Sequence, residues 1–186
     1  MIKVKYAPGL TKVPLIINAM KKFLVLSLLA VAQHGIAQQY LTREATLSFD
    51  AGSSLEDIYA ISESASAVYD AQSGKLGVQV LMTSFQFKRA LMQEHFNENY
   101  VESEKFPKAQ FTGTYEGGKA IGQLTIHGKT KDIAVACELL ETEEGLLLQT
   151  EFPVNIEDFD IPIPSAVAGK ISEVAKINVR AVLKKR

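Results

Sequence analysis

The chain has 186 residues, 47% of them hydrophobic and 22% charged, which suits a single domain with a full hydrophobic core. The formal net charge is −1, but residues 1–37 hold five lysines and no acidic residue, which leaves residues 38–186 with 15 basic and 21 acidic side chains. Phosphate backbones repel a segment this acidic, so the composition argues against nucleic acid as a partner.

The N-terminus has the pattern of an export signal. Residues 20–22 are Met-Lys-Lys, residues 23–32 form an apolar run of ten, and residues 35–37 offer the small side chains that a signal peptidase reads. We predict that residues 1–37 are a signal peptide cleaved after Ala37, with Met20 as the true start. Ten apolar residues are too few for a helix to cross a bilayer core, which argues against the alternative of a retained membrane anchor. We therefore expect a mature protein, residues 38–186, in the bacterial periplasm or outside the cell.

Alternating apolar and polar residues predict strands at the start of this domain. Residues 40–49 and 76–82 alternate clearly, whereas residues 55–69 alternate weakly and fit two short strands or one bent strand. Arg43 interrupts the apolar face of the first strand. We expect its charge to reach solvent rather than to act inside the fold, because arginine is rarely buried.

A single helical segment interrupts the strands. From Ser84 the alternation stops, and Met92, Phe96 and Tyr100 follow at intervals of four residues. This spacing predicts one short amphipathic helix at about residues 89–99.

The second half of the chain returns to alternation. Five further strand patterns lie at residues 109–113, 120–126, 133–139, 146–154 and 175–183. About eight strands, each with one apolar face, predict an all-β fold, an eight-stranded antiparallel barrel that can be filled with side chains or hold one small ligand. Because no loop is long enough for a separate lid, only the helix is expected to cap an opening.

The polar residues do not suggest catalysis. A metal site would need His95 with Glu94 and Glu98, but successive helical residues point about 100° apart, so no metal site is predicted. His127 ends a strand on its polar face and is expected to face solvent or to bond within a turn. Cys137 lies in an alternating segment and is expected to be a small buried hydrophobe rather than a reactive thiol. No other catalytic constellation is visible, so we do not expect an enzyme.

Three segments together resemble the YceI-like family. They are Glu-His-Phe at residues 94–96, Glu-Lys-Phe-Pro at residues 104–107, and Gly-Gln-Leu-Thr-Ile-His-Gly-Lys-Thr-Lys at residues 122–131. The similarity extends from about Tyr40 to the C-terminus. It implies an extended, lipocalin-like barrel, periplasmic or secreted, whose interior holds an isoprenoid or quinone-like lipid and requires no cofactor.

We therefore expect a non-enzymatic protein that carries or sequesters a polyisoprenoid or prenyl quinone, with a possible link to stress, as a monomer or homodimer. The alternative is an envelope or stress protein that acts through its surface and holds no ligand. An enzyme that uses a bound lipid is the least favoured hypothesis.

Candidate ligand-binding residues are the inward-facing side chains of the strands and the apolar side chains of the helical region. For each of them plain core packing is the alternative, because a filled barrel has the same alternation as a hollow one. The barrel candidates are Leu76, Val78, Val80, Phe111, Leu124, Ile126, Val135, Leu148, Phe152, Ile177 and Val179, and the candidates for the mouth or cap are Phe85, Phe87, Met92 and Phe96.

Overall fold

The computed structural model describes residue 3 and residues 38–186. Apart from residue 3, the predicted signal peptide lies outside the described residues. Among the described residues no helix has the length and apolar character needed to cross a membrane.

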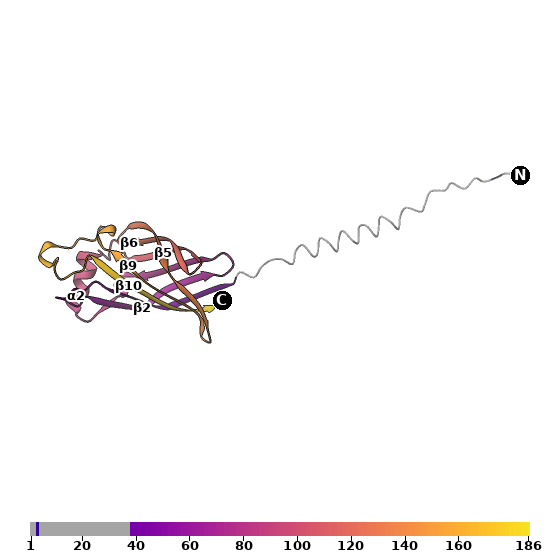
Figure 1. Cartoon of the computed structure of the whole chain (residues 1–186), viewed down its shortest axis with the longest axis horizontal. Helices are drawn as coiled ribbons and strands as arrows, with labels where there is room; N and C mark the ends of the chain where they lie inside the picture. The colour runs from indigo at the N-terminus through magenta and orange to yellow at the C-terminus, as the bar shows by residue number, and fades with distance from the viewer. Residues whose placement is uncertain (1–2, 4–37) are drawn as a thin grey trace. The chain divides into compact units, whose positions relative to one another are not determined.

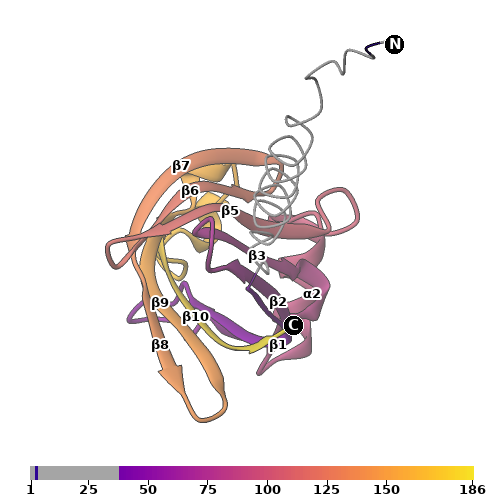
Figure 2. The same ribbon diagram turned by 90° about the vertical axis from the view of Figure 1, so that its right-hand side faces the viewer.

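Residues 38–186 form one curled antiparallel sheet (Figure 1). Its strands are β1 (Gln39–Asp50), β2 (Tyr59–Asp70), β3 (Lys75–Leu81), β4 (Gln86–Phe87), β5 (Lys108–Glu116), β6 (Lys119–Ile126), β7 (Lys129–Ala136), β8 (Glu138–Thr142), β9 (Gly145–Asn155) and β10 (Val174–Lys185). The strand order is β7-β6-β5-β3-β2-β1-β10-β9-β8, and β4 pairs with β2. Seen end-on, the sheet curls around a central space (Figure 2). This confirms the predicted all-β, lipocalin-like barrel.

The strand count differs from the predicted eight in two places. The two-residue β4 is too short to give an alternating pattern, and the predicted strand at residues 133–139 is split into β7 and β8. At Cys137 the backbone N–H donates to the carbonyl of Gly118, 2.9 Å away, and the chain then leaves β6 and pairs with β9. Residues 129–142 thus form one extended segment that pairs with β6 at one edge of the sheet and with β9 at the other. The alternation of apolar residues continues through the change of partner, so the sequence does not indicate the break.

The weak pattern at residues 55–69 corresponds to one long strand, β2. Its register with β1 shifts between Thr42 and Ala45 and again between Ala45 and Leu47. Arg43 lies in this irregular stretch and is exposed, as predicted. The extra residues of such a bulge change which side chains face inward, which accounts for a charge in an otherwise apolar series.

The helical segment consists of α2 (Ala90–His95) followed by a π-helical turn, η2 (Phe96–Tyr100). Together they confirm the predicted short helix. Three 3₁₀ turns complete the domain: η1 (Met82–Ser84), η3 (Glu157–Phe159) and η4 (Ser165–Val167).

One half of the barrel is filled by side chains. Leu183 and Leu146 are 0% and 9% exposed, and the ring of Tyr69 lies 6.5 Å from that of Tyr40 and 6.1 Å from that of Tyr115. These residues lie where β1 begins and β10 ends, at the end opposite α2 (Figure 1). We call this the packed end.

Candidate ligand cavity

An apolar cavity of about 500 Å³ occupies the other half of the barrel. Its wall comes from β1, β3, β5, β6, β7, β9 and β10, together with α2 and η2. Leu91 lines the cavity although 62% of its surface is exposed, and the exposed Arg89 and Lys170 also line it, so the cavity reaches solvent near α2. The volume lies within the range of about 300–1,000 Å³ that is typical of small-molecule sites.

All fifteen candidate residues lie on the cavity wall. They are Leu76, Val78, Val80, Phe85, Phe87, Met92, Phe96, Phe111, Leu124, Ile126, Val135, Leu148, Phe152, Ile177 and Val179. The structure therefore brings them together around one space, and their contact with a ligand stays a prediction.

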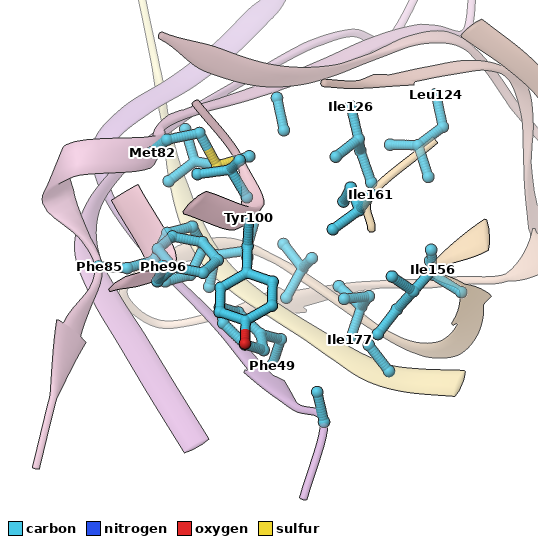
Figure 3. Close-up of a pocket in the computed structure, with 18 of the residues that line it drawn as sticks. Phe49, Met82, Phe85, Phe96, Tyr100, Leu124, Ile126, Ile156, Ile161 and Ile177 are labelled. Carbon is cyan, nitrogen blue, oxygen red and sulfur yellow. The ribbon is translucent and has the colours of Figure 1, made fainter. Parts of the chain in front are cut away.

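Phe49, Phe85, Phe87 and Phe96 line the cavity and form an aromatic cluster. Figure 3 shows Phe49, Phe85 and Phe96 close together on one side of the cavity. The ring of Phe49 lies 5.2 Å from that of Phe85, 5.8 Å from that of Phe87 and 5.3 Å from that of Phe96. Phe49 was not among the candidates. Its signal was present in the alternation of β1, where it shares the inward face with Leu47, another cavity residue.

The face of the helical segment that was predicted from its four-residue spacing does point at the cavity. Met92, Phe96 and Tyr100 all line it, and none of the residues of α2 or η2 is fully buried. One polar contact joins the segment to the sheet: the Gln93 side chain accepts from the backbone N–H of Phe87 in β4 at 3.2 Å. A second bond holds the segment together, since the Asn97 side chain of η2 donates to the Gln93 carbonyl of α2 at 2.8 Å. The segment therefore covers the cavity as a half-exposed flap rather than as a core helix.

A second segment covers the same cavity, contrary to the expectation that no loop could act as a lid. Besides Lys170, five apolar residues of the loop between β9 and β10 line the wall: Ile156, Ile161, Ile163, Val167 and Ile171. The interval between these residues changes from five to two and then to four, and two prolines interrupt the series, so no single period indicates a common apolar face. We call residues 156–171 the cover loop.

The cover loop is tied down at its far end. The backbone N–H of Ser172, the residue that follows the cover loop, donates to the Ala51 carbonyl at 2.9 Å, and the hydroxyl of Ser53 donates to the Gly169 carbonyl at 3.0 Å. Both bonds join it to the segment between β1 and β2, which also contributes Ala51 and Ile58 to the cavity wall.

His127 holds the near end of the cover loop, and here the expectation of a solvent-facing or turn-bonded histidine was wrong. The residue lies in the β6–β7 turn with φ +50°, but it is only 9% exposed and its bonds reach beyond the turn. Nδ1 lies 3.1 Å from the Phe159 carbonyl oxygen, and Nε2 lies 2.9 Å from Oε2 of Glu102. Because both partners accept, the two bonds form together when the imidazole carries both protons.

The hydrogen bond from His127 lowers the pKa of Glu102 below its ordinary value of 4.5. Ion pairs add to this attachment: Nζ of Lys129 lies 2.6 Å from Asp160, and Nζ of Lys131 lies 3.2 Å from Asp158. The contacts fix η3 between β7 and β9, where no ladder joins the two strands.

The charged side chains of the wall come from the segments between the strands rather than from the strands themselves. Arg89 and Glu56 form an ion pair, and the exposed His95 and Lys170 also line the wall. The strands contribute only neutral polar side chains: Gln79, Gln110 and Thr150. Among residues 38–186 no group of three potential metal-ligating side chains occurs. Cys137 lines the deeper wall, and its burial raises the pKa of the thiol to about 11, so it is protonated at neutral pH and behaves as the predicted small hydrophobe.

Comparison with known proteins gives a consistent family and fold. The pattern of the YceI-like domain matches residues 42–183. BcnA of Burkholderia cenocepacia is similar in structure, with a TM-score of 0.64 and 14% identity over 75% of this chain and 94% of that protein. No match is found among curated proteins.

Two further solved structures resemble the chain. A polyisoprenoid binding domain from Saccharophagus degradans, implicated in plant cell wall breakdown, has a TM-score of 0.68 and 10% identity over 81% of this chain and 99% of that domain. The YCEI protein of Campylobacter jejuni has a TM-score of 0.55 and 23% identity over 67% of this chain and 82% of that protein. At these identities the similarity establishes the fold.

Proposed function

Because the chain belongs to the YceI-like family, we propose that residues 38–186 carry or sequester an apolar lipid, an isoprenoid or quinone-like chain, inside the barrel. The polyisoprenoid binding domain among the structural relatives supports this choice of ligand class. We further propose that residues 1–37 export the domain, so that it works outside the cytoplasm.

The observation that carries the proposal is the apolar cavity in one half of a barrel whose other half is filled. A cavity wall built mainly of aliphatic and aromatic side chains offers a ligand few hydrogen bonds, so affinity has to come from burial. At about 25 cal/mol per Å², a chain that buries roughly 200 Å² of apolar surface gains on the order of 5 kcal/mol. A long hydrocarbon chain satisfies this condition, whereas a small polar metabolite does not.

The distribution of polar side chains suggests an orientation for the lipid. The charged or titratable side chains Glu56, Arg89, His95 and Lys170 come from the segments between the strands, whereas the strands contribute only neutral ones, which are apolar except for Gln79, Gln110 and Thr150. We propose that the tail enters first and that a polar head group stays near α2. No reacting group is needed for this task.

Thermal unfolding with and without a prenyl quinone tests the proposal. A ligand that binds only the folded state stabilises it by about 2.7 kcal/mol at a free concentration of 100 times Kd, so the melting temperature should rise with ligand concentration. A saturable rise supports the carrier function. An unchanged melting temperature together with no measurable binding would favour the alternative of a protein that acts through its surface.

A further inference from the structure

Exposed apolar side chains are concentrated at one end of the domain. Within residues 38–186 the large hydrophobic side chains with the greatest exposure are Leu55 (71%), Leu91 (62%), Leu81 (50%), Leu140 (47%), Val174 (47%), Tyr59 (45%), Val68 (45%) and Ile121 (41%). The two highest values belong to residues beside the cavity. Leu91 is part of its wall, and Leu55 lies between the cavity residues Ala51 and Ile58.

Three more of these residues lie at the same end, as the strand pairing shows. Tyr59 begins β2 opposite Asp50, and Val174 begins β10 opposite Asn155. Leu81 ends β3, immediately before Met82 of the cavity wall. We call these five residues the rim: Leu55, Tyr59, Leu81, Leu91 and Val174.

The rim is made of separate pieces rather than one flat patch. Its members come from the β1–β2 segment, α2 and the ends of three strands, and charged residues stand between them. Around Leu55, for example, the neighbours Glu56 and Asp57 are acidic, whereas Lys88, Arg89 and Lys170 of the same end are basic. Mixed charge of this kind gives no strong attraction to an anionic surface.

We propose that the rim docks the cavity opening onto a lipid bilayer, with its apolar side chains inserted among the head groups. This inference rests on the proposed function, because a long isoprenoid chain resides in bilayers and has to leave one to be carried. The exposed rim is continuous with the apolar wall through Leu91, so a chain could pass from bilayer to cavity with little exposure to water. Isolated apolar residues set between charged ones suit a fluid interface, which adapts to them.

Flotation with phosphatidylcholine vesicles tests the docking. The test variant is Leu55→Glu with Val174→Glu, because neither residue lines the cavity. The control is Leu140→Glu with Val68→Glu, which makes the same two changes at similarly exposed positions of the other half of the barrel. We expect the rim variant to lose vesicle association at least about tenfold, since each change replaces an inserted apolar side chain by a charge. The control should float like the wild type, and phosphatidylglycerol in the vesicles should change association by less than about twofold.

A second measurement separates this inference from the proposed function. Prenyl quinone supplied from ethanol should bind the wild type and the rim variant alike, while transfer from vesicles should be slowed only in the rim variant. If the wild type binds prenyl quinone from ethanol but does not float with vesicles, docking is wrong and the carrier function stands. If it floats but never binds prenyl quinone, the carrier function is wrong. A rim that instead joins two copies would give a dimer in light scattering that the rim variant dissociates, without vesicle association, and this too would overturn the docking.

Discussion

The aromatic side chains of the cavity wall differ in how deeply they are buried. Phe85 is 2% exposed and belongs to the core, whereas Phe96 is only partly buried and lies on a segment without a fully buried residue. Their rings lie 5.9 Å apart, so Phe96 adds the flap to an aromatic cluster that the sheet already anchors. Changing Phe96 should therefore affect ligand retention more than folding.

Phe96→Asp should weaken prenyl quinone binding at least about tenfold, because it places a charge against an apolar tail. The circular dichroism of the strands should be unchanged. Leu140→Asp provides the control, since it adds the same charge on β8, away from the cavity. If Phe96→Asp unfolds the domain and Leu140→Asp does not, the helical segment is core and not a flap.

The hydrogen bond between Glu102 and His127 makes the stability of the domain depend on pH. The pKa of Glu102 is lower in the folded protein than in the unfolded chain because His127 donates a hydrogen bond to its carboxylate. This hydrogen bond therefore stabilises the fold fully at a pH above the pKa of the unfolded chain. The stabilisation is lost as the pH falls through the lower pKa of the folded protein. Glu102→Gln should be less stable than the wild type in urea at neutral pH, and the difference should shrink below about pH 4.5. Glu104→Gln, at an exposed neighbouring position, should have little effect at either pH. An effect of Glu102→Gln that stays constant with pH would contradict this role.

At the scale of elements, the flap and the cover loop both depend on the β6–β7 turn. His127 of this turn bonds to the residues that follow the flap and to η3 of the cover loop, and its ring lies 4.5 Å from that of Phe106. Gly128 follows with φ +72°, and a Cβ there would stand 2.5 Å from a ring carbon of Phe106. The turn is therefore packed tightly as well as bent.

Gly128→Ala should destabilise the domain by more than the conformational cost alone. Gly117→Ala is the matched control, because Gly117 also has a positive φ, +56°, but a Cβ there would meet nothing within 4 Å. The left-handed backbone costs alanine about 1–2 kcal/mol in both variants, and the clash should add roughly 1–3 kcal/mol at Gly128. Urea denaturation measures both. If both variants lose the same free energy of unfolding, Phe106 moves aside freely and the β6–β7 turn does not set the position of its neighbours.

Some of these elements and contacts can be predicted from the sequence, and others cannot. Alternation located the long strands and eleven of the fifteen candidate residues, because the inward face of a barrel strand has a period of two whatever fills the interior. The other four, Phe85, Phe87, Met92 and Phe96, came from the helical region where the alternation stops. The cover loop was missed because the apolar residues Ile161, Ile163 and Val167 follow no single period and stand among prolines. The burial of His127 was missed because its partners, Glu102 and Phe159, are 25 and 32 residues away in the sequence.

On the scale of the whole molecule, the two halves of the barrel differ in what fills them. The packed end has tyrosines and leucines where the other half has a cavity, so the domain keeps a core while leaving room for a ligand. The flap, the cover loop and the rim all lie at the hollow half. This division of the barrel is the physical basis for the proposed carrier, since a barrel packed throughout would have no space to offer.

The most direct test is mass spectrometry of an organic extract from the protein purified out of cells that make isoprenoid lipids. The carrier account predicts an apolar lipid with a long prenyl chain, present in proportion to the wild-type protein and depleted in Phe96→Asp. Extracts from Leu140→Asp should match the wild type. An extract without such a lipid, from folded protein that also fails to bind added prenyl quinone, would contradict the account.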